Sequence, residues 1–537
     1  MPEKRQRLHE TLLIGVFCGF FFFYGLGAVG LLGADEPRYA QVAREMLARN
    51  DWVTPTLWGK PWLEKPPLLY WGEMVFFWLL GVRDWAARVP SAVLATLMIA
   101  GLYLFLRRFF FSGASRSSAE ISGAFVAAST VGIFSFARGA ETDMSLAACF
   151  ALAMLAWLAW HLSSEKKFLA GFYFFLAAAT LAKGPVAPLL AGLIIALFAL
   201  AQRELRLVMR TLQWPGISLF VLVAAPWYVL VQARNPQFFN EFFLQHNVAR
   251  FTTNLYRHPH AFWYYLPVLL LGLFPWTLFA LAGWIDAMRH WRKPEDDIGR
   301  VRARKFLMIW ALVPVMVFSF SQSKLPGYIL PAVPAWMLLA AIYLQDRIEH
   351  VAPVRIWFSA LHAIFIAVIC GAVILAPQLM LLAHEATPKV GDDFLVLIPA
   401  NVLRTAAIVA ALVFAFVLVL LRVGGWEMAR LATLVPTILA LAFVVKVAAP
   451  VVDGAQSARP LAQQLAAYTR APIAVLGLHR GIEYGLGFYR NRQIEAYKPG
   501  AGRRLLIAPM DSASLPAQRV FVGEYGPTRL GFWWVEK

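Results

Sequence analysis

Charged residues and cysteines are scarce in this 537-residue chain. Only 15% of the residues are charged, 60% are hydrophobic, and the mean hydropathy is +0.61. A soluble domain of this length would need far more polar surface, so the composition predicts a polytopic membrane protein. The cysteines Cys18, Cys149 and Cys370 all fall inside apolar runs. That placement favours packing residues over a disulfide framework or a thiolate metal site.

Acidic residues are outnumbered, since 49 Lys and Arg against 31 Asp and Glu give a net charge of +18. Much of this excess lies in short connectors between apolar runs, where basic residues set the orientation of a membrane protein. Nucleic-acid binding is therefore not expected. No loop offers a glycine-rich phosphate cradle, so neither a nucleotide-sugar site nor a nucleotide cofactor is expected.

About thirteen apolar runs are long enough to cross a bilayer. They lie at 11–33, 86–106, 119–137, 143–161, 167–183, 185–202, 213–233, 262–285, 304–322, 326–345, 354–376, 399–421 and 427–448. A further apolar stretch, 66–81, is short, opens with two prolines and contains Glu73. It is typical of a helix that lies in the membrane interface.

Basic residues alternate along the chain in a way that indicates orientation. If the N-terminus lies inside, every inside connector is basic, whereas the outer loop 34–85 is balanced and 377–398 leans acidic. The positive-inside rule therefore predicts a cytoplasmic N-terminus and a C-terminus outside the membrane. Residues 1–450 form the expected transmembrane domain, with long outer loops at 34–85 and 234–261.

The chain changes character after residue 450. A helix is expected at 460–468 and short strands at 473–478, 505–508 and 519–523, which together predict a small α/β domain at 451–537 outside the membrane.

Ionisable residues collect at the outer ends of the apolar runs. If these runs form a bundle, their outer ends make one rim that holds carboxylates and cations, as a phosphate-handling site requires. The rim residues are Asp35, Glu36, Arg138, Glu141, Asp143, Lys183, His246, Arg250, Arg257, His258, His260, Lys324 and Tyr328. Simpler interpretations are also open. A charge at the end of an apolar run is often only an interfacial anchor, and Asp35 could be a helix cap. Glu64 and Lys65 could form an ion pair with each other and have no further role.

Several short motifs occur together in the expected membrane part. They are Asp35-Glu36-Pro37-Arg38-Tyr39, Asp51-Trp52-Val53-Thr54-Pro55, Glu64-Lys65-Pro66-Pro67, His246-Asn247-Val248-Ala249-Arg250-Phe251, His258 through Tyr265, and Ser323-Lys324-Leu325-Pro326-Gly327-Tyr328. In combination they resemble the bacterial aminoarabinose transferases that modify lipid A (ArnT-like). That family belongs to the GT-C membrane glycosyltransferases, which include the protein O-mannosyltransferases. The resemblance covers roughly residues 1–450.

This resemblance implies a GT-C fold in the bacterial inner membrane, with a periplasmic site and a polyprenyl-phosphate sugar as donor. The implied acceptor is lipid A or another lipopolysaccharide group, and 4-amino-4-deoxy-L-arabinose is the leading sugar. By position, Asp35 resembles the essential acidic residue and Asp143 a second carboxylate. Glu64 and His258 resemble a pair that holds a divalent metal ion. The donor phosphate would be bound by Lys65, Arg250 and Tyr328, to which we add Lys324.

Two other functions are weighed against this one. A related enzyme that adds another sugar to a glycolipid or a protein would share the same motifs. A lipid or sugar transporter would place its ionisable residues at mid-bilayer depth in broken helices, whereas here they lie at the outer rim.

Overall fold

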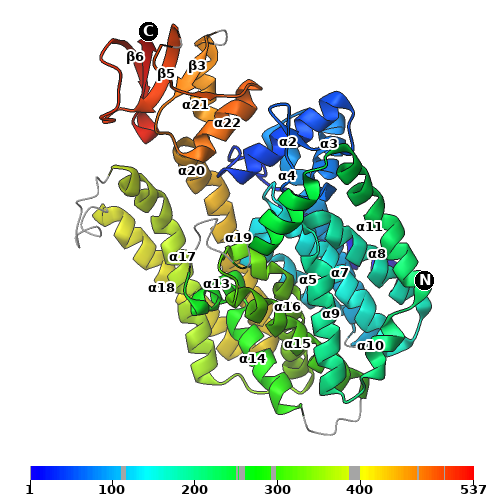
Figure 1. Ribbon diagram of the computed structural model, residues 1–537. Coiled ribbons are helices and arrows are strands. Elements are labelled where there is room, and N and C mark those ends of the chain that lie inside the picture. The colour runs from blue at the N-terminus through cyan, green and yellow to red at the C-terminus, as the bar shows by residue number, and fades with distance from the viewer. Residues whose placement is uncertain are drawn as a thin grey trace.

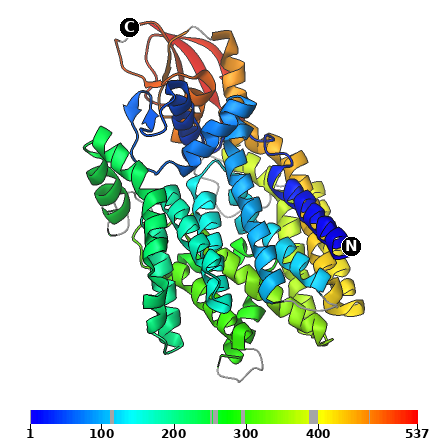
Figure 2. The same ribbon diagram turned by 90° about the vertical axis from the view of Figure 1, so that its right-hand side faces the viewer.

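The computed structural model describes residues 2–110, 116–249, 252, 260–291, 298–385, 399–468, 471–500 and 502–536. Long helices form a bundle, and the C-terminal residues form a small α/β domain at one end of it (Figure 1). Helices α2 (Asp35–Arg49) and α3 (Leu68–Leu80) lie at this same end, which we term the domain end (Figure 2). The sequence-based fold class, a helical membrane protein with a small C-terminal α/β domain, is confirmed.

The remaining elements of the bundle follow in chain order. They are α1 (Pro2–Cys18), η1 (Gly19–Phe23), the short strands β1 (Thr56–Leu57) and β2 (Lys60–Pro61), α4 (Asp84–Phe109), α5 (Arg116–Ala128), α6 (Val131–Ala137), α7 (Thr142–Ser163), α8 (Lys166–Lys183), α9 (Val186–Ala201), α10 (Arg206–Thr211), α11 (Trp214–Arg234), η2 (Phe239–Ala249), η3 (Phe262–Tyr264), α13 (Tyr265–Gly272), α14 (Thr277–Arg289), α15 (Ile298–Ser319), η4 (Pro326–Ala332), α16 (Val333–Glu349), α17 (Ile356–Glu385), α18 (Ala400–Val423), η6 (Gly425–Met428), α19 (Ala429–Phe443), η7 (Val444–Ala448) and α20 (Ala449–Gln456).

Seven helices in the described ranges are long and apolar enough to cross a membrane, or up to eight if a bent pair is counted as one span. The expected count of about thirteen is thus not confirmed. Several apolar runs fold into shorter or broken helices. The run at 119–137 is divided between α5 and α6, α9 has only 16 residues, and the run at 262–285 bends by 113° before Thr277. Pro275 lies in that bend, where its missing N–H cannot continue a helical ladder.

The first apolar run is helical only as far as Phe23. Residues 24–34, which we call the unwound segment, have no helix or strand and run directly into α2. Gly25 and Gly33 there adopt φ of 65° and 60°, a region that glycine enters without steric cost. The expected continuous span at 11–33 is therefore shorter than the sequence indicated.

Helix α7 lies at the centre of the bundle and packs against α4 and α8. Of its 22 residues, 16 are buried, including Trp157, which stacks on Phe306 of α15. Because α7 is apolar on all sides, it fits a helix surrounded by other helices rather than one that faces lipid on one side.

The C-terminal domain contains a five-stranded sheet in the order β4-β3-β5-β7-β6. Its elements are α21 (Arg459–Gln464), η8 (Leu465–Tyr468), β3 (Ile473–Val475), α22 (Arg480–Arg490), β4 (Glu495–Ala496), β5 (Arg504–Pro509), β6 (Arg519–Tyr525), η9 (Gly526–Thr528) and β7 (Leu530–Val535). The predicted helix and all three predicted strands are present, but α22, β4 and β7 were not expected. Alternate residues of β5 pack on opposite faces of the sheet, so both faces are covered by apolar side chains.

Candidate active site

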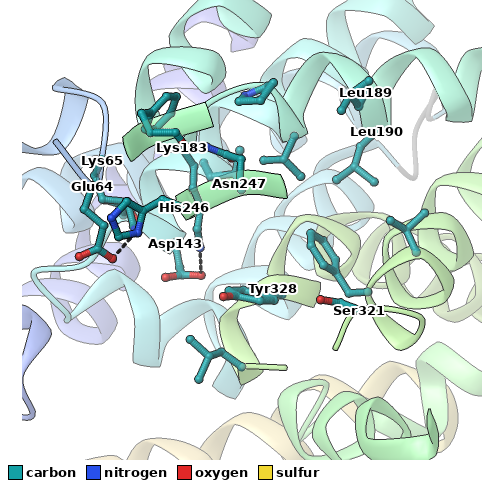
Figure 3. Close-up of a pocket in the computed structure, with 18 of the residues that line it drawn as sticks. Glu64, Lys65, Asp143, Lys183, Leu189, Leu190, His246, Asn247, Ser321 and Tyr328 are labelled. Atoms are coloured by element: carbon teal, nitrogen blue, oxygen red, sulfur yellow. Dashed lines mark hydrogen bonds and ion pairs between the residues drawn. The ribbon is translucent and has the colours of Figure 1, made fainter. Parts of the chain in front are cut away.

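A cavity of about 450 Å³ opens at the domain end of the bundle. Glu64 and Lys65 lie at one end and Leu189 and Leu190 at the other, with Asp143, Lys183 and Tyr328 between them (Figure 3). The walls come from α2, the loop before α3, α7, α8, α9, η2, α15 and η4. A cavity of this kind can hold a molecule that is ionic at one end and apolar at the other.

The central ion pair joins the ends of two neighbouring helices. Asp143 lies in the first turn of α7 and Lys183 in the last turn of α8, and their Oδ1 and Nζ atoms are 2.6 Å apart. These positions match the helix dipoles, since a carboxylate is favoured at an N-terminus and a cation at a C-terminus. The Lys183 ammonium also lies 4.9 Å from the centre of the Tyr328 ring, within reach of a cation–π contact.

A second group of charges lies beside the first turn of α2. Arg38 pairs with Asp35, one helical turn earlier, and its Nη2 is 3.6 Å from Oε2 of Glu64. The other oxygen of Glu64 is 2.6 Å from Nζ of Lys65. Burial alone would raise the pKa of Glu64, but Lys65, Arg38 and the neighbouring His246 together lower it well below its usual range. Glu64 is therefore ionised and holds two cations at the edge of the cavity.

Glu141 also lines the cavity, immediately before α7. Burial and the carboxylates of Asp143, Glu36 and Asp35 raise the pKa of Glu141 to about 8, against the opposing effect of Lys183. At neutral pH Glu141 is therefore mainly protonated and adds little negative charge beside Asp143.

A buried ion pair supports the floor of the site. Glu36 and Arg88 are 4% exposed each and meet through two contacts, 3.0 Å from Nε to Oε1 and 2.6 Å from Nη2 to Oε2. Glu36 also accepts from the backbone N–H groups of Leu32 and Ala140, at 2.7 and 2.8 Å. The pair thus connects α2 with α4, the unwound segment and the start of α7.

The predicted site residues occupy different places. Five of them line the cavity, namely Asp35, Asp143, Lys65, Tyr328 and Glu64. Lys324 is buried nearby, but its ammonium donates to the carbonyl oxygens of Ser321 and His260, at 2.6 and 3.1 Å, and it is not part of the lining. Arg250 and His258 lie outside the described residues.

Four further residues that line the cavity or contact its lining received no role from the sequence, although all four belong to motifs or rim positions named there: Arg38, Glu141, Lys183 and His246. Arg88, which supports the site through Glu36, carried no signal in the sequence. The signal for Lys183 was available. Residues 143 and 183 lie 21 and 19 positions from Ser164, which ends α7 and turns the chain into α8. Antiparallel neighbours that are nearly equidistant from their connecting turn meet across the helix pair.

The described residues do not by themselves fit a metal site. No group of three or more His, Cys, Asp or Glu side chains within the described ranges is placed to hold a metal ion. The Glu64 carboxylate, the one described member of the predicted metal pair, already contacts Lys65 and Arg38. A cation at Glu64 would have to share it with these two positive side chains.

The apolar end of the cavity opens along α9. Leu189 and Leu193 line it and are 70% and 40% exposed, although both are large hydrophobic side chains. Exposed leucines on a helix of a membrane protein are solvated by lipid, so an apolar chain can extend from the cavity along this face.

Comparison with known proteins gives consistent results. A family model described as dolichyl-phosphate-mannose-protein mannosyltransferase matches residues 64–229. Undecaprenyl phosphate-alpha-4-amino-4-deoxy-L-arabinose arabinosyl transferase from Serratia proteamaculans is 31% identical over 394 residues, which is 71% of this chain and 68% of that protein. The protein of the same name from Shewanella sediminis is 28% identical over 374 residues, covering 69% of this chain and 66% of its own.

Solved structures share the fold. The crystal structure of ArnT from Cupriavidus metallidurans bound to undecaprenyl phosphate has a TM-score of 0.73 and 24% identity, with 97% of each chain covered. The archaeal oligosaccharyltransferase from Archaeoglobus fulgidus has a TM-score of 0.53 and 11% identity, covering 93% of this chain and 65% of its own. The sequence-based expectation of a GT-C fold is confirmed.

Proposed function

Because the chain belongs to the ArnT-like family of GT-C membrane glycosyltransferases, we propose that it transfers 4-amino-4-deoxy-L-arabinose from undecaprenyl phosphate to lipid A. The observation that carries this proposal is the division of the cavity into an ionic and an apolar end. A polyprenyl-phosphate sugar has the same division, with a charged headgroup on a long hydrocarbon chain.

The donor is expected to lie with its isoprenoid chain along Leu189 and Leu193 and its phosphate at the ionic end. Lys65, at that end, and Lys183 and Tyr328, between the two ends, are the proposed phosphate ligands, together with Arg250. In the reaction the bond between the sugar's anomeric carbon and the phosphate oxygen breaks, and the phosphate takes the electron pair. Cations at the cavity wall stabilise the charge that develops on this leaving group.

The new bond forms between the anomeric carbon and an oxygen of the acceptor, so a single displacement inverts the anomeric centre. A phosphate group of lipid A is already ionised at neutral pH and requires no base, whereas a hydroxyl acceptor would have to lose a proton. Asp35 is the better placed of the two carboxylates to meet the acceptor. Its side chain is 45% exposed, while that of Asp143 is 17% exposed and paired with Lys183.

A divalent metal ion is a separate part of the proposal and depends on His258 joining Glu64. No step above requires the metal. The measurement is the metal content of purified wild-type protein, Glu64→Gln and His258→Ala. Bound metal in the wild type and its loss in both variants would support the pair, and equal metal content in all three would remove it.

We also propose that the domain end faces the periplasm of a bacterium and the opposite end the cytoplasm. Support comes from the basic residues at the opposite end, where α4 and α14 end and α8 begins: Arg107, Arg108, Lys166 and Arg289. Reporter fusions in the loops after α4 and after α11 test this orientation, and a periplasmic signal from the first would contradict it.

One alternative acceptor has support of its own. The family model that matches residues 64–229 describes enzymes that transfer mannose to protein. A protein acceptor would carry the sugar on a hydroxyl group and would need a base such as Asp35.

The function is tested by mass spectrometry of lipid A from a strain that lacks this protein. The strain is supplied with wild-type protein, with Asp35→Asn, or with Asp511→Asn as a control on an exposed turn of the C-terminal domain. We expect the wild type and the control to restore a pentosamine on lipid A and Asp35→Asn to fail at equal protein level. Unchanged lipid A in all strains, with a changed glycoprotein, would favour the protein acceptor. Full activity of Asp35→Asn would contradict the role of Asp35.

A further inference from the structure

The C-terminal domain, together with α20, the helix that leads into it, contacts the unwound segment at closely spaced points just before Asp35. Asp453 of α20 accepts from the backbone N–H of Gly30 at 2.7 Å, and the hydroxyl of Tyr489 in α22 accepts from the N–H of Leu31 at 3.0 Å. Arg459, the first residue of α21, donates to the carbonyl oxygens of Gly27 and Ala28 at 2.9 and 3.1 Å. These are four backbone groups that a helix would have satisfied internally.

The three side chains also hold one another in place. Arg459 bonds Asp453 at 2.7 Å and Asp84, the first residue of α4, at 3.0 Å. The Tyr489 hydroxyl, which accepts from Leu31, donates to the same oxygen of Asp84 at 3.1 Å. Asp84, Asp453, Arg459 and Tyr489 therefore form one polar network, which we call the clamp.

The fit between the clamp and the unwound segment is close. A Cβ atom on Gly30 would come within 2.3 Å of the Ser457 side chain and 2.5 Å of the Tyr489 hydroxyl, so only glycine can lie at this position without a shift. Further along, a Cβ atom on Gly481 would come within 2.9 Å of the carbonyl oxygen of Gly33. Contacts this tight leave the backbone little freedom of position.

The same domain also fixes the helix that follows. Arg44 of α2 donates to the carbonyl oxygen of Phe488 at 2.7 Å and to Asn491 at 3.1 Å, and its guanidinium lies 4.2 Å from the Phe488 ring centre. Phe488 is buried in the cluster that contains Tyr39 and Met46 of α2. Asp35 and Glu36 thus lie between two anchored stretches, the clamped segment before them and the packed helix after them.

We propose that the C-terminal domain is a positioning domain for the active site, and that Tyr489 and Arg459 hold Asp35 in register with the donor cavity. This inference rests on the proposed function for its kinetic readout only. Neither residue lines the cavity, so both act through the backbone and are positioning residues. The proposed phosphate ligands Lys65, Lys183 and Tyr328 lie outside α2 and the unwound segment, so we expect the clamp to act on Asp35 more than on donor binding.

The test compares two single-atom changes in the same domain. Tyr489→Phe removes the hydroxyl that accepts from Leu31 and donates to Asp84. Tyr525→Phe is the matched control, because the Tyr525 hydroxyl also ties the domain to the bundle, donating to the carbonyl oxygen of Gly454 at 2.7 Å rather than to the unwound segment. Each hydrogen bond lost in this way changes an equilibrium by about two- to tenfold, and of the two that Tyr489 loses, the bond to Leu31 is the one that bears directly on the unwound segment. We expect Tyr489→Phe to lower kcat about two- to tenfold with an unchanged KM for the donor, and Tyr525→Phe to leave kcat unchanged.

A second readout does not depend on the substrate. Hydrogen exchange of the full-length protein is measured on peptides that cover residues 27–34, where the amides of Gly30 and Leu31 are bonded to the clamp. Tyr489→Phe is expected to raise exchange there and Tyr525→Phe is not. Arg459→Ala is expected to raise exchange further and Arg459→Lys to recover part of the protection, because lysine keeps the charge but loses the fork of donors.

Failure of the proposed function and failure of the positioning inference give different results. If wild-type protein transfers no sugar but exchange changes as expected, the proposed function fails and the clamp stands. If exchange at 27–34 is unchanged in Tyr489→Phe, or if both tyrosine variants lower kcat equally, the clamp is a general stabilising contact and the positioning inference is overturned.

Discussion

The ion pair between Glu36 and Arg88 allows a sharp test of how the site is supported. Glu36→Gln keeps the shape of the side chain but removes its charge, which leaves the buried Arg88 guanidinium without a counter-ion. Arg88 also donates to the carbonyl oxygens of Leu26, Val29 and Gly30, at 3.0, 2.6 and 2.7 Å, and these neutral acceptors cannot replace the charge. The amide nitrogen of glutamine would in addition face a donor, because both carboxylate oxygens of Glu36 accept from N–H groups.

The expected loss follows from the burial of both partners. Breaking a fully buried ion pair by removing one partner costs about 3–5 kcal/mol of folding free energy. With an unfolding entropy of about 2.1 cal/mol/K per residue, a chain of 537 residues has an entropy change of roughly 1.1 kcal/mol/K. Dividing the first value by the second gives a fall in Tm of about 3–4 °C.

The matched control is Glu73→Gln on the neighbouring helix α3. Glu73 is fully buried, and neither of its carboxylate oxygens has a hydrogen-bond partner within the described part of the chain. Burial, with a smaller effect of Glu36, raises the pKa of Glu73 well above its usual range, which favours the neutral acid that the amide imitates. Thermal unfolding in lipid nanodiscs, followed by tryptophan fluorescence, is expected to show a lower Tm for Glu36→Gln only. Equal losses in both variants, or none in Glu36→Gln, would refute this account of the pair.

Three further predictions concern the cavity itself. Lys183→Met is expected to lower kcat/KM about tenfold to a hundredfold, because Asp143 loses a charged hydrogen bond. Lys183→Arg is expected to recover part of the activity. A fully active Lys183→Met protein would argue against the importance of the ion pair between Asp143 and Lys183. Activity of the wild type is expected to fall by about tenfold from pH 7 to pH 9, because Glu141, with a pKa raised to about 8, gains a negative charge as the pH rises. Glu141→Gln should remove this decline, and a decline that persists in that variant would assign it to another group. Leu189→Asn is expected to raise the donor KM several-fold, because it removes apolar surface at the end of the cavity where the isoprenoid chain is expected to lie. The control is Leu200→Asn, at an exposed position of α9 outside the cavity, which should leave KM unchanged.

Local patterns in the sequence predicted the elements that carry the site. Acidic residues followed by a proline favoured a helix start at Asp35, and α2 does begin there. The interpretation of Asp35 as a helix cap is wrong, because Ala34 is the N-cap and no side chain caps the helix. Asn50 ends the helix in a left-handed conformation, with its N–H bonded to the Leu47 carbonyl. The collection of charges at the ends of the apolar runs indicated a common rim, and five of the predicted site residues do line one cavity. These predictions depend on interactions between residues close together in the chain, and a single sequence shows those residues directly.

Side-chain direction could not be predicted in the same way. Lys324 was grouped with the phosphate ligands because it lies in the loop between α15 and η4, at the rim, but its ammonium is bound by two backbone carbonyl groups. The sequence shows which loop contains a cation, while the backbone path of that loop decides where the cation points. A loop without regular structure has unpaired carbonyl groups, and a buried lysine satisfies them at short range.

The unwound segment helps to explain why neither the number of membrane spans nor the role of the C-terminal domain could be predicted from the sequence. Four glycines at 25, 27, 30 and 33 interrupt an apolar run that is otherwise long enough to cross a bilayer. Once the helix stops at Phe23, the carbonyl groups beyond it need donors, and they receive them from three arginines far apart in sequence. Arg138 donates to Tyr24 and Gly25, Arg88 to Leu26, Val29 and Gly30, and Arg459 to Gly27 and Ala28. None of these arginines carries a sequence signal for this contact, because its partner is a backbone oxygen that every residue has. The backbone groups before Asp35 that have no helical partner therefore depend on the C-terminal domain for hydrogen bonds. A variant in which residues 24–30 form a helix would satisfy these groups internally, and it is expected to displace Asp35 from the cavity.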